Sequence, residues 1–148
     1  MDILVALAVM LFFLLLKGFF SGSEIALVSS DKIKLRHKAK QGSRGAGLAL
    51  GLFRNPDVLL STTLVGTNIS TVILTTFGTL FMIRLFGASG EIYAFVILTP
   101  ILLILGEIVP KSVYQQKSDE LTPIIVYPLR WASWLFYPVV FVFSRIAR

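Results

Sequence analysis

The sequence contains no cysteine, one histidine and few charged residues. The absence of cysteine among 148 residues excludes a disulfide framework, a thiolate metal site and a cysteine nucleophile. The histidine, His37, lies in a basic stretch, where a solvated surface position is its ordinary place. Charged residues make up 15% of the chain, whereas a soluble domain usually has about a quarter. The low charge content therefore argues against a soluble globular domain.

Apolar residues are abundant instead, at 55% of the chain, with a mean hydropathy of +0.82. They form long runs, which predict an all-α integral membrane protein. We expect three transmembrane helices over residues 3–28, 57–86 and 91–110, some of them interrupted by polar motifs. At about 1.5 Å per residue, each is long enough for a hydrocarbon core of roughly 30 Å. The first run is not typical of a signal peptide, because Asp2 replaces the basic residues that should precede it.

Half of the basic residues lie between the first two runs, within residues 31–54. They are Lys32, Lys34, Arg36, Lys38, Lys40, Arg44 and Arg54. The positive-inside rule explains this cluster better than nucleic-acid binding does, so we expect no nucleic acid partner. We predict two short cytoplasmic helices here, with the amino terminus outside the cell and the carboxyl terminus in the cytoplasm.

Residues 119–148 contain three prolines and an aromatic cluster around Trp131 and Trp134. Aromatic side chains of this kind favour the membrane–water interface. A fourth span would place Arg145 and Arg148 outside. We therefore expect a bent juxtamembrane helix along the cytoplasmic interface, and a fourth span is the alternative.

Three short polar motifs lie inside the apolar runs. They are Ser21-Gly22-Ser23-Glu24, Gly66-Thr67-Asn68 and Gly106-Glu107-Ile108-Val109-Pro110. Counted from the flanking charges, Ser21 and Gly106 each fall roughly 7 Å to the cytoplasmic side of the centre of their span. Asn68 falls near the centre, about one helical turn away in depth. Three independent segments therefore predict one polar layer, and we expect the motifs to form one site.

The third motif has the most explicit physics. Pro110 has no backbone N–H, so in a helix the carbonyl four residues earlier, that of Gly106, loses its usual partner. Glu107 follows directly and is a carboxylate in an apolar run. A buried carboxylate needs a partner, a proton or an ion, so the motif predicts a cation site.

The other two motifs also offer oxygen atoms. Ser21 and Glu24 match a capping box, which predicts that the first span is broken near residues 18–21. Gly66 loosens the second span just before Asn68, whose amide oxygen can bind a cation. Hydroxyl, amide, carbonyl and carboxylate oxygens suit Mg²⁺, Ca²⁺ or Na⁺ better than soft transition metals.

Simpler interpretations remain open for the same residues. Gly18, Gly22 and Ala26 form a stripe of small residues that is able to pack helices and do nothing else. An asparagine in a span often makes only an interhelical hydrogen bond. Lys17 is a possible ion-pair partner of Glu107 or of the first-motif glutamate, and that pairing would give the whole cluster a purely structural role.

Taken together, the stretches Phe19–Leu27, Val65–Ile69 and Leu105–Lys111 resemble the transmembrane domain of the CorC/CNNM (cyclin M) family. Three motifs in the same order make the resemblance specific, and it covers nearly the whole of residues 1–148 as one domain. It implies a homodimer of three-span subunits in the lipid bilayer that exports Mg²⁺ in exchange for Na⁺. Members usually continue into regulatory cytoplasmic CBS domains, which are absent from this chain. Lys17 has no place in the family pattern and leaves the Na⁺ coupling open.

The resemblance also implies a largely dehydrated Mg²⁺ held by all three motifs. Carried onto this sequence, the metal ligands are Ser21, Ser23, Asn68, Gly106 through its carbonyl, and Glu107, with Gly22, Glu24, Gly66 and Pro110 in supporting roles. Which of these bind the ion directly stays open.

We therefore expect a Mg²⁺ transporter that works by alternating access and is not an enzyme. A divalent cation channel is disfavoured, because the outer half of the first span, residues 3–16, offers no polar side chain. A membrane Mg²⁺ sensor that does not transport is a second alternative. A hydrolase using Ser21 or Ser23 with Lys17 is the weakest alternative, because no histidine lies in the spans.

Overall fold

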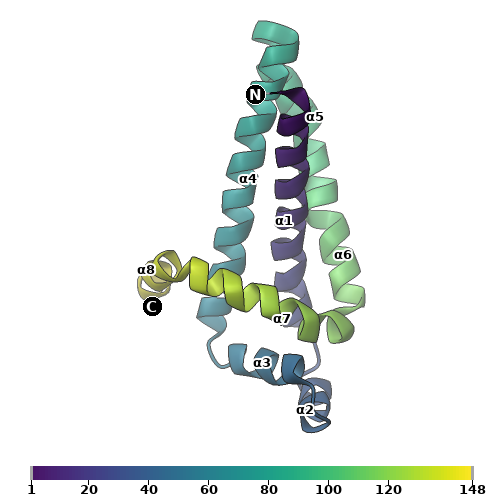
Figure 1. The fold of residues 1–148 in the computed structure, drawn as a ribbon, viewed down its shortest axis with the longest axis vertical. Coiled ribbons are helices and arrows are strands. Elements are labelled where there is room, and N and C mark those ends of the chain that lie inside the picture. Colours follow the sequence, from purple (N-terminus) through teal and green to yellow (C-terminus); the bar gives the residue numbers. More distant parts are fainter. Residues whose placement is uncertain (1, 148) are drawn as a thin grey trace.

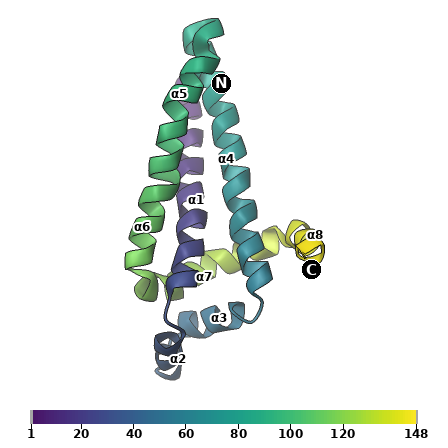
Figure 2. The ribbon, with the colours of Figure 1, turned by 180° about the vertical axis from the view of Figure 1, so that it is seen from behind.

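Three long helical rods form an elongated bundle in the computed structural model, which describes residues 2–147 (Figure 1). The first rod is α1 (Ile3–Ser29) and the second is α4 (Pro56–Phe86). The third is built from α5 (Gly90–Leu103), the π-turn η2 (Ile104–Ile108) and α6 (Val109–Gln116). The view from behind shows the same arrangement, with the three rods side by side (Figure 2).

Two helical stretches are long and apolar enough to cross a membrane: Ile3–Ser29, and the 61 residues Pro56–Gln116. The second turns back on itself at the short 3-10 helix η1 (Gly87–Ser89), where Gly87 has a φ of +67° that favours glycine. Only 22% of each apolar window is buried within the chain. The structure thus confirms that the described residues form an all-helical fold. Most of the apolar surface of its long helices is not covered by the rest of the chain.

The predicted break in the first rod is wrong. Helix α1 runs without interruption through Ser21, whose side chain is buried inside the bundle and caps nothing. The physical reason is packing, because Gly18 faces the ring of Pro110 and Gly22 faces the ring of Tyr114. The stripe of small residues thus lets α6 approach closely, and a straight helix is what this approach requires.

The two short helices predicted within residues 31–54 are present, as α2 (Lys32–Lys40) and α3 (Arg44–Leu52). The Asp31 side chain caps α2 by accepting the N–H of Ile33, and the Ser43 side chain caps α3 by accepting the N–H of Ala46. Both helices lie below the same end of the bundle (Figure 1).

The last segment crosses the bundle and forms no fourth rod (Figure 1). It consists of α7 (Ser118–Leu135) and α8 (Tyr137–Ala147), which meet at Phe136. The predicted bent helix over 119–148 is therefore present up to residue 147, and Arg148 lies outside the described residues. Its buried side chains Ile125 and Leu129 join Phe20 and Leu27 of α1 in the main apolar core.

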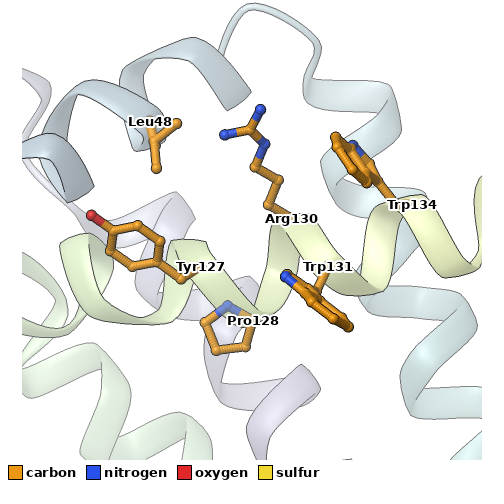
Figure 3. Close-up of a pocket in the computed structure, with 6 residues that line it drawn as sticks. All are labelled: Leu48, Tyr127, Pro128, Arg130, Trp131 and Trp134. Atoms are coloured by element: carbon orange, nitrogen blue, oxygen red, sulfur yellow. The ribbon is translucent and has the colours of Figure 1, made fainter.

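An open groove of about 470 Å³ lies along α7, beside α3 (Figure 3). It is lined by Leu48, Tyr127, Pro128, Arg130, Trp131 and Trp134. Arg130 points toward α3 with its guanidinium 5.6 Å from the ring of Trp134. Exposed aromatic rings on a crosswise helix are the arrangement expected at a membrane interface.

The contact between α3 and α7 predicts opposite effects for two glycines of α3. A Cβ added to Gly45 would collide with the backbone carbonyl of Pro123, whereas one added to Gly47 would meet open space. We expect Gly45→Ala to lower the stability by about 1–3 kcal/mol through overpacking. Gly47→Ala should leave it unchanged or raise it by up to about 1 kcal/mol. Thermal unfolding in detergent measures both, and equal melting temperatures would contradict this packing.

A carboxylate at the start of α7 ties this helix to α2. Asp119 accepts the backbone N–H of Asp31 at 2.9 Å and the ammonium of Lys34 at 3.2 Å. The hydrogen bond from the Asp31 backbone and then the nearby lysines hold the pKa of Asp119 below its usual range. A lowered pKa means that the charged form stabilises the fold above the unfolded pKa of about 3.9, and that this stability is lost as the pH falls through the lowered value.

The amide signal of Asp31 in an NMR pH titration reports this bond directly. We expect the transition caused by Asp119 to have its midpoint below about pH 3.9 and to be absent from the Asp119→Asn variant. A midpoint at or above the ordinary aspartate value would show that the bond does not form.

Candidate cation site between the three helices

The centre of the bundle is held together by one buried lysine. Lys17 on α1 is 2% exposed, and its Nζ lies 2.8 Å from Oε1 of Glu107 and 2.8 Å from Oγ1 of Thr71. The carboxylate comes from the π-turn of the third rod and the hydroxyl comes from α4. One ammonium therefore connects all three rods. The pair is asymmetric, because the Lys17 side chain is 3% exposed and that of Glu107 is 36% exposed.

Close packing brings the three sequence motifs to the same level of the bundle. Gly66 of the second motif faces the Phe20 ring, next to the first motif. Gly106 of the third motif faces the Lys17 stem. Each glycine leaves space that a neighbouring side chain fills, so the rods approach closely here. The common depth predicted for the motifs agrees with these contacts.

The third rod is irregular at the predicted position. The turn Ile104–Ile108 is a π-helix, and the N–H of Val109 donates to the Ile104 carbonyl, five residues back. Pro110 follows directly and offers no N–H of its own. A single π-turn absorbs an extra residue in the helix and is frequent at functional sites. The interruption predicted at Gly106–Pro110 is thus a widened turn that carries Glu107 toward Lys17.

The remaining predicted residues differ in how far they are buried. Ser21 and Ser23 are 1% and 0% exposed, whereas Asn68 is exposed on the surface of α4. Glu24 is half-buried, and within residues 2–147 its carboxylate makes no hydrogen bond or ion pair. The hydroxyls of Ser23 and Thr67 are buried without a hydrogen-bond partner in the same part of the chain.

Helical spacing places two of these residues, Ser21 and Asn68, within about one turn of the residues that form the Lys17 contact. Ser21 lies four residues after Lys17 on α1, and Asn68 lies three residues before Thr71 on α4. Residues three or four apart share a helix face, about one turn of roughly 5.4 Å apart. Because α1 and α4 run in opposite directions, both shifts point toward the α7 end of the bundle (Figure 1). Ser21 and Asn68 therefore lie about one helical turn along their helices from the residues that bond the ammonium.

The pairing between Lys17 and Glu107, open from the sequence, is the arrangement that the structure has. Glu107 is therefore not a free carboxylate here, and the contact is the one that the purely structural interpretation predicts. The pairing of Lys17 with Ser21 or Ser23 that a hydrolase would need is not formed, because the ammonium bonds Glu107 and Thr71.

Sequence reasoning missed Thr71 and the orphaned hydroxyl of Thr67. Thr67 lies inside the second motif, where the amide of Asn68 is the more obvious ligand. Thr71 is one of nine hydroxyl residues in the second run, and no local signal marks it out.

The described residues contain no group of three histidine, cysteine, aspartate or glutamate side chains that would hold a metal ion. The side-chain oxygens of the three motifs are instead one paired carboxylate, several hydroxyls and an amide. These oxygen atoms are hard ligands that carry little negative charge. They therefore suit a cation that binds reversibly better than a metal ion that is held permanently.

The sequence matches a known protein family. Residues 8–148 match the model of the cyclin M transmembrane N-terminal domain (CNNM). The chain belongs to this family. It is 33% identical over 136 residues to the UPF0053 inner membrane protein YfjD of Escherichia coli, and 34% identical over 131 residues to a UPF0053 protein of Haemophilus influenzae. A DUF21 domain-containing chloroplastic protein of Arabidopsis thaliana is 33% identical over 128 residues.

These alignments cover 90%, 88% and 84% of this chain, respectively. The chain spans about a third of the two bacterial relatives, 31% of each, and 19% of the plant protein. With an inner membrane relative and two apolar helical stretches, this cyclin M domain is a membrane protein.

The buried ion pair predicts a measurable coupling between its partners. Glu107→Gln leaves the Lys17 ammonium buried without a counter-charge and should destabilise the domain more than Lys17→Met does. The double variant should lose less stability than the sum of the single losses, by about 1–2 kcal/mol, because Glu107 is partly exposed. Unfolding in detergent without Na⁺ or Mg²⁺ measures the cycle. Strictly additive losses would mean that the two side chains do not interact.

Proposed function

We propose that this chain is the membrane domain of a Mg²⁺ transporter with three spans, α1, α4 and the rod α5–α6. The amino terminus lies outside the cell, and α2, α3, α7 and α8 lie at the cytoplasmic interface. The basic residues of α2 and α3 support this orientation. The crosswise path of α7 supports its interfacial position (Figure 2). We propose that the chain forms one domain and that cytoplasmic CBS domains complete the full-length protein.

One observation supports the ion site above the others: two buried hydroxyls, of the first and second motifs, have no hydrogen-bond partner in the described part of the chain. Buried hydroxyls are nearly always hydrogen-bonded, because leaving one unpaired is unfavourable. The Ser23 and Thr67 hydroxyls depart from this rule within the described residues. A cation bound beside either hydroxyl would take up one lone pair of its oxygen.

The proposed ligands of Mg²⁺ are Ser21, Ser23, Asn68, Glu107 and the Gly106 carbonyl. Mg²⁺ prefers oxygen ligands in octahedral geometry and gives up its water reluctantly. A cage of neutral oxygens with one carboxylate would replace part of that water and compensate part of the charge. Membership in the cyclin M family supports Mg²⁺ over other hard cations.

Transport by alternating access requires an element that moves, and the π-turn η2 is the irregular element at the site. The unbroken α1 packs into the core and serves as the fixed side. We propose that movement of η2 and α6 opens the site to the cytoplasm and that exchange for Na⁺ drives efflux. Thr76 is exposed on α4, and polar groups are unfavourable in lipid, which supports a homodimer across this face.

Mg²⁺ efflux from liposomes that contain the purified protein tests the proposal. Glu107→Ala and Asn68→Ala should each reduce efflux at least tenfold while the dimer still assembles in size-exclusion chromatography. Thr99→Ala is the matched control, since Thr99 is an exposed hydroxyl residue on α5 away from the motifs, and its efflux should equal that of the wild type. Normal efflux from both site variants would overturn the site.

The same assay separates the proposed carrier from its rivals. Saturating flux supports a carrier, whereas flux that rises linearly with Mg²⁺ concentration indicates a channel. Mg²⁺ binding without any flux indicates a sensor.

A further inference from the structure

Lys17 is the least expected residue at the site. A lysine inside an apolar span is unfavourable unless it is paired, and this one is 2% exposed. Its stem packs against Gly106, where the missing Cβ leaves room for the Cδ and Cε atoms of the lysine. Its ammonium then reaches one carboxylate oxygen and one hydroxyl oxygen, each at 2.8 Å. The chain thus holds a positive charge at the carboxylate proposed to bind the ion.

We propose that the Lys17 ammonium is a tethered counter-cation, which occupies Glu107 when no metal ion is bound and competes with free cations for it. This inference rests on the proposed function and assigns a role to a residue outside the predicted ligand set.

The contacts of the ammonium are those that a small monovalent cation would make. A carboxylate and a hydroxyl oxygen are hard ligands, and an ammonium carries the same single charge as Na⁺. The pair with Glu107 is neutral, so no free cation is needed to balance the carboxylate within the membrane. Lys17 therefore takes the place of a monovalent ion that is unable to leave.

Loading of Mg²⁺ must then displace the ammonium. Ser21 and Asn68 lie about one helical turn from Lys17 and Thr71, so a divalent ion among them would lie close to the fixed positive charge. The two cations repel each other and compete for the Glu107 carboxylate. The ammonium therefore weakens Mg²⁺ binding and supplies the push that helps release the ion.

Replacing the lysine by an uncharged side chain of similar length tests this role. In Lys17→Met, Glu107 lacks its cation, so Na⁺ should raise the melting temperature of this variant relative to the large cation N-methyl-D-glucamine. The wild type, whose carboxylate already holds the ammonium, should show a smaller difference. The Kd for Mg²⁺ should fall at least tenfold in Lys17→Met.

Two further variants make the result specific. Lys117→Met removes an exposed lysine with no side-chain partner in the described part of the chain, and it should behave as the wild type does. The double variant Lys17→Met with Glu107→Gln should lose the response to Na⁺, because the carboxylate is gone.

An unchanged Kd together with no response to Na⁺ in Lys17→Met would overturn the inference, and so would weaker Mg²⁺ binding. If Lys17→Met fails to fold in every salt while the double variant folds, no free cation replaces the ammonium and the inference is also wrong. If the wild type and Lys17→Met both fail to bind Mg²⁺, the proposed function fails. In that case, the effect of Na⁺ on the melting temperature of Lys17→Met still tests whether Lys17 acts as a tethered cation.

Discussion

The contact among Lys17, Thr71 and Glu107 is the interaction on which the rest of the bundle depends. A lone ammonium in an apolar bundle is strongly unfavourable, so its carboxylate and hydroxyl partners must come from the neighbouring rods. This requirement sets the relative height of α1, α4 and η2. The small residues then follow from it, because Gly66 and Gly106 let the rods approach closely enough for the side chains to meet.

The end of the bundle obeys a different constraint. There, charged and aromatic residues meet water, and the chain lays α7 across the rods with α3 packed on it. Asp119 joins α7 to α2 through a backbone N–H and a lysine, which are contacts of a solvated surface. The apolar rods are thus stabilised by close packing of small residues. The helices α2, α3 and α7 at the end of the bundle are stabilised by caps and charged contacts.

Much of the architecture could be predicted from the sequence because it follows from apolar runs and charge placement. The rods, the two short helices and the crosswise last segment are examples. The irregular turn before Pro110 was predictable because proline has no N–H. The break in α1 was predicted wrongly, because a capping pattern at Ser21 is local whereas the fit of Gly22 against Tyr114 is tertiary. The Thr71 contact was out of reach for the same reason, since nothing local distinguishes it from other threonines of α4.

The central claim is that oxygens of three rods form one cation site around Glu107. A series of Kd values for Mg²⁺, Ca²⁺, Mn²⁺ and Na⁺, measured on the wild type and on Glu107→Ala, tests it most directly. We predict that the wild type binds Mg²⁺ more tightly than Na⁺ and that Glu107→Ala weakens Mg²⁺ binding at least tenfold. Equal Mg²⁺ affinity in both proteins would contradict a site at this level of the bundle.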